Sequence, residues 1–431
     1  MSEATLAGKP AIAIVHYTAP PIIGGVEAVI AAHVRSLSRA GYPVAVLAGR
    51  GEAASLQRGA RAHPAAAFVH VPELDSLRSK DASAALRAGH VPGDFRERVS
   101  RARAALEPHL ARFDVVIVHN IFFKHFNLPL TAALWEMLDD RVLPKCIAWG
   151  HDFSWTSPSS RKAVYERYPW DLLRQRRPDV TYVAVSARRQ RELAGLFGCP
   201  PEDIRVVYNG VDPEDLLGLS PQGAELAGRL GLYGSAPVLL MPVRVTRAKN
   251  IELALEVVAA LKRLGHRPKL VLTGPPDPHD PASMAYFDEL RARRRNLDVE
   301  AEMTFVFEAG PEPGQPLYLD ARAVGDLYRL ADILFMPSHR EGFGMPVLEA
   351  GLAGLPVACT AIPSAAELAA DDALIFEADD DPGEIAGRIL ARLESDPIYR
   401  LRRRVRARYT WDAILEQDIV PLLAPAPASA S

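Results

Sequence analysis

Apolar residues occur along this chain in short unbroken runs, and the segments between the runs carry apolar residues at every third or fourth position. Unbroken apolar runs of this length are typical of parallel strands that are buried on both faces of a sheet. Apolar residues three and four positions apart lie on one side of a helix. Because the two patterns alternate from the first run onward, the chain is predicted to be an α/β protein of the doubly wound kind.

The first half of the chain repeats this strand and helix unit several times. Gly41 ends the first predicted helix, and the loop before that helix contains Gly24 and Gly25. The predicted strands are 11–15, 43–49, 114–120, 145–152, 180–186 and 204–212, and the predicted helices are 26–41, 95–113, 128–138 and 187–198. These elements predict one domain over residues 1–212.

A change in composition follows Asp212. Residues 213–237 are rich in Gly, Ser and Pro and separate two series of strands and helices, so they are interpreted as a hinge region. The second series consists of strands 238–245, 269–274, 303–308 and 331–338, with a helix at 251–266. It predicts a second α/β domain over residues 213–407, built like the first.

Length and composition narrow the functional classes. A chain of 431 residues with 48% hydrophobic content can bury more than one core, and its net charge of −3 provides no basic domain for nucleic acid. Cys146, Cys199 and Cys359 are odd in number and lack the C-x-x-C spacing of a zinc site or redox motif. No apolar run reaches the roughly 18 to 20 residues of a membrane span, and the N-terminal run is too short for a secretory signal. We expect a soluble, cytoplasmic protein whose last residues, 424–431, are disordered.

Glycines and a helix start follow the apolar run at 331–338. Glu341, Gly342, Phe343 and Gly344 come directly after it, and Pro346 suits the first turn of a helix. Glycines let backbone N–H groups approach a ligand closely, and the start of a helix adds unpaired N–H groups and a partial positive charge. The sequence therefore predicts an anion site, most simply for phosphate.

Two carboxylates accompany this anion site. An ionised carboxylate only accepts hydrogen bonds, so Glu341 and Glu349 suit two diols, one on a sugar and one on a ribose, with a diphosphate between them. The alternative is that Glu349 is an ordinary acid of the first helical turn and Glu341 a solvated loop residue. Arg244 and Lys249 follow the first strand of the second domain, where they either face solvent or neutralise that diphosphate.

The first domain offers other candidates. His119 and His151 follow the carboxyl ends of predicted strands, the edge at which open parallel sheets bind ligands, although either histidine can simply be a loop residue. Gly24 and Gly25 alone are compatible with a plain tight turn. The arginine-rich stretches 96–103 and 174–178 are interpreted as solvated helix faces, with attraction to an anionic acceptor or a membrane surface as the alternative.

Together these residues resemble a known family. Glu341, Gly342, Phe343, Gly344 and Glu349 match its two glutamates around a Gly-Phe-Gly loop, and its other motifs are matched by Arg244 with Lys249, YNGVD at 208–212, Gly24 with Gly25 and Glu27, and His151. The chain resembles the retaining glycosyltransferases of family 4, which have the GT-B fold of two Rossmann-like domains facing across a cleft. The resemblance extends from the first strand to about Trp411.

The resemblance implies a role for each matched residue. Catalytic residues would be Glu341, His151, Lys249 and Arg244, and the donor-binding residues would be Gly24, Gly25, Gly342, Phe343, Gly344, Met345 and Glu349. Residues 1–212 would bind the acceptor and residues 213–407 the nucleotide-sugar donor. A terminal helix over about 408–424 would pack back on the first domain.

The resemblance also implies the reaction. A hexosyl group would pass from a UDP- or GDP-hexose to a hydroxyl of a sugar, a glycolipid or a small molecule, with retention of configuration, no cofactor and no metal. Peripheral contact with a membrane is compatible with it. The alternatives are a non-catalytic nucleotide-sugar-binding or scaffold subunit, and a nucleotide-sugar epimerase or phosphorylase of the same fold. Departures from the family pattern at IPSAAE (362–367) and VFEAG (306–310) leave the sugar and the base open.

Overall fold

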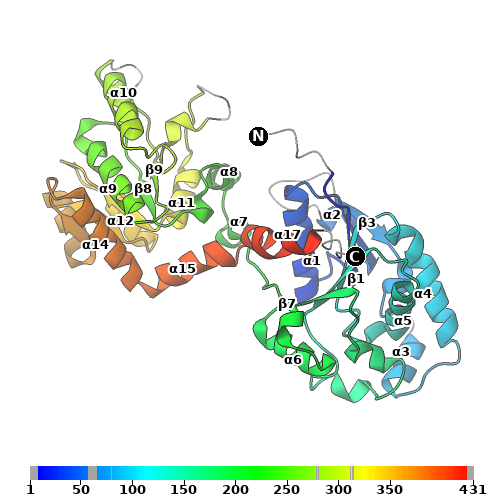
Figure 1. Ribbon diagram of the computed structural model, residues 1–431. Coiled ribbons are helices and arrows are strands. Elements are labelled where there is room, and N and C mark those ends of the chain that lie inside the picture. The colour runs from blue at the N-terminus through cyan, green and yellow to red at the C-terminus, as the bar shows by residue number, and fades with distance from the viewer. Residues whose placement is uncertain are drawn as a thin grey trace, which may run out of the picture. The chain divides into compact units, whose positions relative to one another are not determined.

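The computed structural model describes residues 8–56, 66–78, 80–277, 279, 281–310, 312 and 315–424. It divides into two compact units. Unit 1 ends at Asp212 and takes up the chain again from Tyr409, and unit 2 comprises Pro213–Arg408. Figure 1 labels the elements of both units. The expected disorder at the C-terminus concerns a segment of which all but Ala424 lies outside the described residues.

Unit 1 is built on a parallel sheet in the order β3-β2-β1-β4-β5-β6-β7. Val15 of β1 lies opposite Leu47 of β2 on one side and Val118 of β4 on the other, so β1 is fully enclosed by its neighbours. The strands are β1 Ile12–Thr18, β2 Val44–Arg50, β3 Ala66–His70, β4 Val115–His119, β5 Lys145–Gly150, β6 Val180–Ala184 and β7 Arg205–Val206. The strand predicted at 204–212 shrinks to the two residues of β7.

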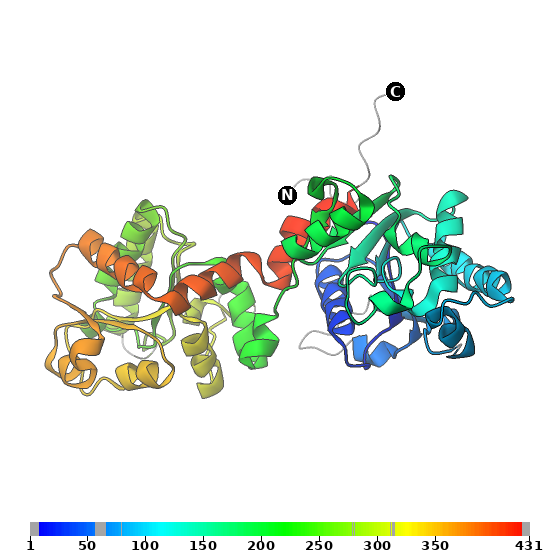
Figure 2. The ribbon, with the colours of Figure 1, turned by 90° about the horizontal axis from the view of Figure 1, so that it is seen from below.

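Helices cover both faces of this sheet (Figures 1 and 2). Alternate residues of β1 divide between the faces: Val15 packs with α4 and α5, while Ile14 packs with α1 and the C-terminal helical segment around Ile414. The helices of unit 1 are α1 Gly25–Arg39, α2 Ala53–Leu56, α3 Lys80–Arg87, α4 Phe95–Leu110, α5 Leu128–Asp139, α6 Ala187–Phe197, α16 Trp411–Ile414 and α17 Val420–Leu423, with short 3₁₀ turns that include η2 Pro72–Leu74 and η3 His125–Asn127. The last residues of the described chain thus belong to the core of unit 1.

Unit 2 has a second parallel sheet, in the order β10-β9-β8-β11-β12-β13. Its strands are β8 Val238–Met241, β9 Lys269–Leu272, β10 Met303–Phe305, β11 Ile333–Met336, β12 Val357–Thr360 and β13 Leu374–Phe376. Leu239 and Met241 face a core shared with α9, α10 and α14, and Leu240 faces a core shared with α8, α11 and α12. The predicted fold class, α/β with two Rossmann-like parallel-sheet units, is confirmed.

The segment interpreted as a hinge belongs to unit 2 instead. Residues 213–237 contain two helices, and Ser220 caps the second of them by accepting a hydrogen bond from the Gly223 backbone N–H. Asp326 of α11 accepts hydrogen bonds from the backbone N–H and the hydroxyl of Ser220, which fixes the segment to unit 2. The chain therefore passes between the units at Asp212–Pro213 and again at Arg408–Tyr409.

The remaining helices of unit 2 complete its two layers. They are α7 Pro213–Leu217, α8 Pro221–Arg229, α9 Ile251–Arg263, α10 Pro281–Asn296, α11 Ala321–Leu330, α12 Met345–Leu352, α13 Pro363–Ala369, α14 Pro382–Ser395 and α15 Pro397–Arg408, with the 3₁₀ turn η8 Arg247–Lys249 among the short elements. Arg406 of α15 pairs with the buried carboxylate of Asp332 at 2.6 Å, and Asp332 also accepts a hydrogen bond from the backbone N–H of Val238. This contact fixes α15 at the amino end of β8 and β11.

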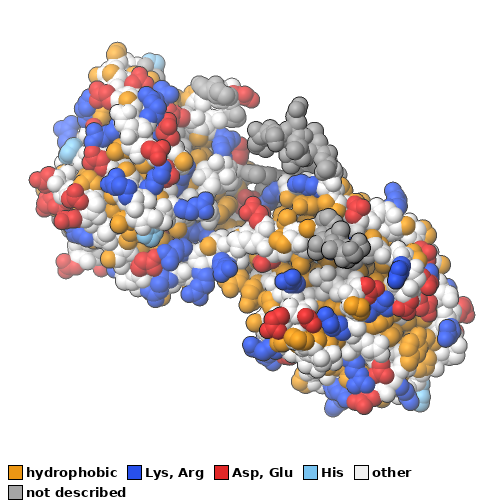
Figure 3. All heavy atoms as spheres, viewed as in Figure 1, with side chains coloured by type: hydrophobic (Ala, Val, Ile, Leu, Met, Phe, Trp, Pro, Cys, Tyr) orange, Lys and Arg blue, Asp and Glu red, His pale blue; other side chains and the backbone are white. Residues whose placement is uncertain are grey.

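The surface carries both signs of charge. On the face viewed in Figure 3, cationic and anionic side chains are interspersed over both units. Within the described parts of the chain, no helix combines the length and the apolar character that crossing a membrane demands.

Candidate functional site

In each sheet the strand order reverses at one place. The loops that follow the two adjacent strands there lead the chain toward opposite sides of the sheet. In unit 2 the reversal lies between β8 and β11, because the chain continues from β8 to β9 on one side and reaches β11 on the other. In open parallel sheets ligands bind outside the carboxyl ends of the strands at this reversal. The loops after β8 and β11 contain Arg244, Lys249 and Glu341.

Local backbone geometry positions Lys249. A single 3₁₀ turn, Arg247–Lys249, follows β8, and Asn250 then adopts a left-handed conformation with φ 48° before α9 begins. Asparagine tolerates this conformation better than most residues. The Asn250 residue is buried, so the turn is held in the body of unit 2 and Lys249 stands at its end.

Lys249 and Glu341 form an ion pair. The Lys249 Nζ lies 2.6 Å from Glu341 Oε1, and the Ser338 hydroxyl donates to the same carboxylate oxygen at 2.7 Å. The Glu341 side chain is only 9% exposed and that of Lys249 19%, so the pair is largely removed from water. A carboxylate in this setting is fixed in place by its partners, which excludes the alternative that Glu341 is a freely solvated loop acid.

Two further hydrogen bonds tie the loops together. The backbone N–H of His339 donates to the carbonyl of Ala248 at 2.9 Å, which joins the β11 loop to the β8 loop directly. The Thr360 hydroxyl at the end of β12 donates to the carbonyl of Ser338. Three neighbouring strands therefore support the position of Glu341.

The glycine loop leads into α12, Met345–Leu352. Gly344 has φ 98° and is the residue before the helix, and a Cβ there would lie 3.3 Å from Leu368 Cδ1. Gly342, by contrast, has open space where a Cβ would stand. No side chain caps the helix, while Phe343 and Met345 are exposed. The first turn of α12 thus has no side-chain cap for its backbone N–H groups, and the anion site predicted there stays a prediction.

Glu349 lies one turn further along α12, beyond the first turn, so the alternative of an ordinary first-turn acid is wrong. The Tyr328 hydroxyl of α11 donates a hydrogen bond to Glu349 Oε2. Burial raises the pKa of Tyr328 most, and the hydrogen bond to Glu349 raises it further, so the phenol stays protonated. The hydrogen bond from Tyr328 therefore orients the Glu349 carboxylate through one of its two oxygens.

Arg244 lies apart from the ion pair. It is exposed on the loop after β8, makes no ion pair with a described residue, and lines a hollow with Pro275 and Tyr286. The β8 and β9 loops run close together next to this hollow, since a Cβ on Gly274 would lie 2.4 Å from the carbonyl oxygen of Val243. The structure thus joins Lys249 directly to Glu341 and places Arg244 on the same loop.

In unit 1 the strand order reverses between β1 and β4. Gly24 and Gly25 follow β1, and Gly24 precedes α1 in an extended conformation without a side-chain cap. Glu27 accepts a hydrogen bond from the Thr18 hydroxyl at the end of β1. A Cβ on Gly24 would collide with this Glu27 carboxylate, so the glycine leaves room for the acid in the first turn of the helix.

Histidines line the same edge of unit 1. His119 Nδ1 lies 3.0 Å from His151 Nε2, and the His151 backbone N–H donates to Asn120 Oδ1 at 2.9 Å. His16 Nδ1 lies 2.9 Å from the carbonyl oxygen of His119. Loss of hydration lowers the pKa of His151 to about 3 and that of buried His119 well below its usual range. These histidines are neutral at pH 7, and their rings take part in hydrogen bonds without carrying a charge.

Several of these residues escaped the sequence reasoning. Ser338 and Tyr328, which orient the two glutamates, lie in an apolar strand end and an amphipathic helix and have no local pattern that marks them. His16 and Asn120 likewise act only through neighbours distant in the sequence. The structure shows Asn120 with a φ of 60°, a left-handed conformation that asparagine adopts more readily than most residues, but the sequence gives only an asparagine after a strand.

Family models match both halves of the chain. Residues 23–215 match the model described as glycosyltransferase family 4, and residues 224–409 match the model described as glycosyl transferases group 1. The chain belongs to glycosyltransferase family 4. The predicted family membership and its GT-B fold class of two Rossmann-like domains are confirmed.

Known family relatives share part of the chain. A mannosylglucosylglycerate synthase of Petrotoga mobilis is 26% identical over 57% of this chain and 58% of that protein. A D-inositol 3-phosphate glycosyltransferase of Kineococcus radiotolerans is 33% identical over 44% of this chain and 41% of that protein. The chain thus spans about half the length of the curated relatives it matches. A crystal structure of Anabaena HepE with UDP is 18% identical over 96% of this chain and 99% of that one, with a TM-score of 0.34.

Proposed function

We propose that this protein is a retaining glycosyltransferase that moves a hexosyl group from a UDP- or GDP-hexose to an acceptor hydroxyl, without a metal. The observation that carries the proposal is the ion pair of Lys249 and Glu341 beside the uncapped start of α12. A cation, bare amides and an oriented carboxylate in one place suit a ligand that joins a diphosphate to a sugar.

The positive groups serve the diphosphate. Lys249, Arg244 and the backbone N–H groups around Gly344 would bind it in the ground state and stabilise the added charge as it leaves. Hydrogen bonds from charged donors to phosphate are stronger than neutral ones, so these groups matter most when the bond to the sugar breaks. They provide the positive charge that a metal ion provides in other enzymes. We therefore expect full activity in the presence of a chelator such as EDTA.

The carboxylates serve the two hydroxyl-bearing ends of the donor. Both Lys249 and Ser338 contact Glu341 Oε1, and no described residue donates to Oε2. That oxygen would accept from the hydroxyls of the donor sugar. Tyr328 occupies Glu349 Oε2 in the same manner, which leaves Oε1 for the ribose hydroxyls. In each case one oxygen fixes the side chain and the other is free to bind.

Residues of unit 1 have proposed roles as well. His151 is neutral and would hydrogen-bond the donor sugar, while the loop at Gly24 and Gly25 would contact the diphosphate. Unit 1 would bind the acceptor and unit 2 the donor. The acceptor's hydroxyl would attack on the face from which the diphosphate leaves, and the leaving phosphate would take its proton, so no carboxylate nucleophile is required.

The acceptor is proposed to be a polyhydroxylated molecule, either a sugar, a glycolipid or a small compound. The relatives named above act on D-inositol 3-phosphate or make mannosylglucosylglycerate, by their names. The non-catalytic alternative, and an epimerase or phosphorylase, would use the same carboxylates to bind a nucleotide sugar without transfer to an acceptor.

A donor panel tests the proposal. The protein is incubated with UDP- and GDP-hexoses and candidate acceptors, and mass spectrometry detects the product while nucleoside diphosphate release is measured. We expect release with one donor class and its loss in Glu341→Ala. The control is Glu300→Ala, which removes an exposed acid of unit 2. Binding without release for every donor would support a non-catalytic subunit, and turnover retained by Glu341→Ala would contradict the assignment.

A further inference from the structure

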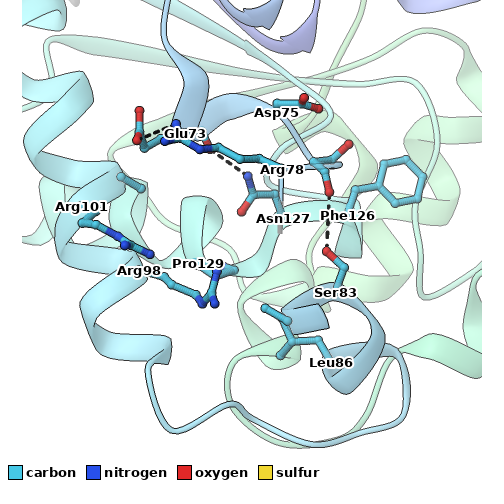
Figure 4. A pocket seen from close by; sticks show the side chains of 13 residues that line it. Glu73, Asp75, Arg78, Ser83, Leu86, Arg98, Arg101, Phe126, Asn127 and Pro129 are labelled. Carbon is cyan, nitrogen blue, oxygen red and sulfur yellow. Dashed lines mark hydrogen bonds and ion pairs between the residues drawn. The ribbon is translucent and has the colours of Figure 1, made fainter. Parts of the chain in front are cut away.

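A pocket lies in unit 1 at the carboxyl ends of β3 and β4 (Figure 4). Its walls are η2, α3, α4 and the residues that lead into α5. Arg98 and Arg101 project into it from α4, on the side opposite Ser83 and Leu86 of α3. Arg98 and Arg101 thus line a concave site, a position that the interpretation of 96–103 as a solvated helix face did not include.

Most carboxylate and amide oxygens of the pocket already have partners. Glu73 pairs with Arg78 at 2.8 Å, and Asp75 pairs with Arg50 at 3.2 Å while it also accepts from the Leu77 backbone N–H. Asn127 donates to the carbonyl of Glu73 at 3.0 Å and accepts from the Leu130 backbone N–H. A ligand that enters therefore finds few free acceptors.

Donors, by contrast, remain. The Arg78 side chain is 52% exposed and uses one guanidinium nitrogen on Glu73. The Arg101 side chain is 57% exposed, and its nearest acid, Glu97, is 3.5 Å away. Each guanidinium carries five N–H donors in a planar fork that matches carboxylate and phosphate oxygens. Excess donors and a shortage of acceptors favour a ligand with an anionic group.

An apolar wall faces the arginines. Phe126, at 37% exposed, lines the pocket together with Leu86 and Pro129 and presents a ring on which the C–H face of a sugar or cyclitol can pack. Contacts lead from this ring to the edge that holds His151. The Lys124 ammonium lies over the Phe126 ring and pairs at 2.6 Å with Asp152, the residue after His151.

We propose that this pocket binds the acceptor through an anionic substituent, a phosphate or a carboxylate, on a hydroxyl-bearing ring. Arg78 and Arg101 hold the anionic group, and Phe126 supports the ring. The inference rests on the proposed transferase function, because it treats the ligand of this pocket as the molecule that receives the sugar. It adds the charge of that molecule and the residues that select it.

Binding measurements on the full chain test the inference. The probes are glucose 6-phosphate, glucuronate and glucose, titrated by calorimetry into the wild type, an Arg78→Gln, Arg101→Gln double variant, and Arg96→Gln. Arg96 is exposed on the same helix but does not line the pocket, so it is a matched control. We expect the wild type to bind an anionic probe at least about tenfold more tightly than glucose, and the double variant to lose about ten- to a hundredfold of that affinity.

The outcomes separate the inference from the function on which it rests. Equal affinity of the wild type for glucose and both anionic probes, or unchanged anion binding in the double variant, would overturn the inference. The phosphate and carboxylate probes decide which group is selected. If no donor is ever cleaved while anion binding still depends on Arg78 and Arg101, the transferase proposal fails and the anion site stands.

Discussion

The carboxyl edges of the two sheets share a topology but differ in chemistry. In unit 2 the reversal of strand order brings together an ion pair, Lys249 and Glu341, and an uncapped helix start. In unit 1 the equivalent edge carries neutral histidines, among them His119 and His151, and a separate pocket with arginines. One fold thus supports a site for charge in one unit and a site for neutral hydrogen bonding in the other.

The difference bears on the role proposed for each unit. In the proposed reaction the leaving diphosphate needs fixed positive charge, which Lys249 and the backbone of α12 in unit 2 would provide. A histidine with a pKa of about 3 has little tendency to take a proton at pH 7, so His151 is a poor general base and a good neutral hydrogen-bond partner. This supports a mechanism in which the leaving phosphate, rather than a protein side chain, receives the acceptor's proton.

Removing the cation of the ion pair should have the largest effect. In Lys249→Ala, Glu341 loses its charged partner and the diphosphate loses a cation, so we expect turnover to fall by about 10²- to 10³-fold. Lys262→Ala is the matched control, because Lys262 pairs with Asp298 and Glu302 elsewhere in unit 2. Steady-state rates with the best donor provide the measurement. Equal losses in both variants would show that the ion pair has no special role.

Low pH should have the next largest effect, and it should destabilise unit 1 more than unit 2. Burial lowers the pKa of His33 to about 3, and loss of hydration lowers that of His151 to about 3. Below about pH 6.5 the unfolded chain binds protons that folded unit 1 rejects, so its free energy of unfolding falls as pH falls, by about 1.4 kcal/mol per pH unit for each such histidine. The described histidines of unit 2 are not buried.

Hydrogen exchange of the whole protein from pH 7 to pH 4 can measure this. Rates corrected for intrinsic exchange should show earlier loss of protection in β1, β4 and β5 than in β8 and β11. Simultaneous loss in both sheets would contradict the assignment of neutral histidines to unit 1.

Substitutions in the glycine loop should have a smaller effect, and two neighbouring glycines can be compared directly. Gly344 has φ 98° and Leu368 close by, so Gly344→Ala should cost about 1 to 2 kcal/mol of stability and lower donor affinity. Gly342→Ala has open space for its methyl group and should leave stability nearly unchanged. Chemical denaturation compares the two. Equal costs would mean that the left-handed turn before α12 is not required.

Tyr328→Phe should have the smallest effect. It removes the hydrogen bond that orients Glu349, so the Michaelis constant for the donor should rise about 2- to 10-fold with little change in kcat. Tyr399→Phe, the same change on α15, is the control. A matching rise in the control would point to a general loss of packing in unit 2.

The sequence predicted most of the strands because buried parallel strands are unbroken apolar runs, as at 331–338. It missed β3, β12 and β13, which are short strands at or next to the edges of the two sheets. It predicted that Glu341 and Lys249 lie near each other, because both follow strand ends and strand ends converge in a parallel sheet, and the two residues form an ion pair. It could not predict Ser338 or Tyr328 as partners, since their role depends on contacts between distant segments. Residues 213–237 were interpreted as a hinge because the segment has the composition of a linker. Ser220 and Pro221 instead start a helix there.

The pocket of unit 1 was also beyond local reasoning. Its lining comes from four separate segments, and an arginine that lines a pocket has the same neighbours in sequence as one that faces water. Arg98 and Arg96 differ in surroundings only once α4 is packed against α3 and the loop before α5. Tertiary packing thus decides which of the arginines are functional candidates.

The central claim is that the free oxygen of Glu341 binds the donor sugar while Lys249 and the turn before α12 bind the diphosphate. Calorimetric titration of nucleoside diphosphate and of the matching nucleotide hexose, in the wild type and in Glu341→Ala, tests it directly. The account predicts that the wild type binds the hexose-bearing ligand more tightly and that Glu341→Ala loses this difference but keeps its affinity for the nucleoside diphosphate. A full preference for the hexose retained in Glu341→Ala would contradict it.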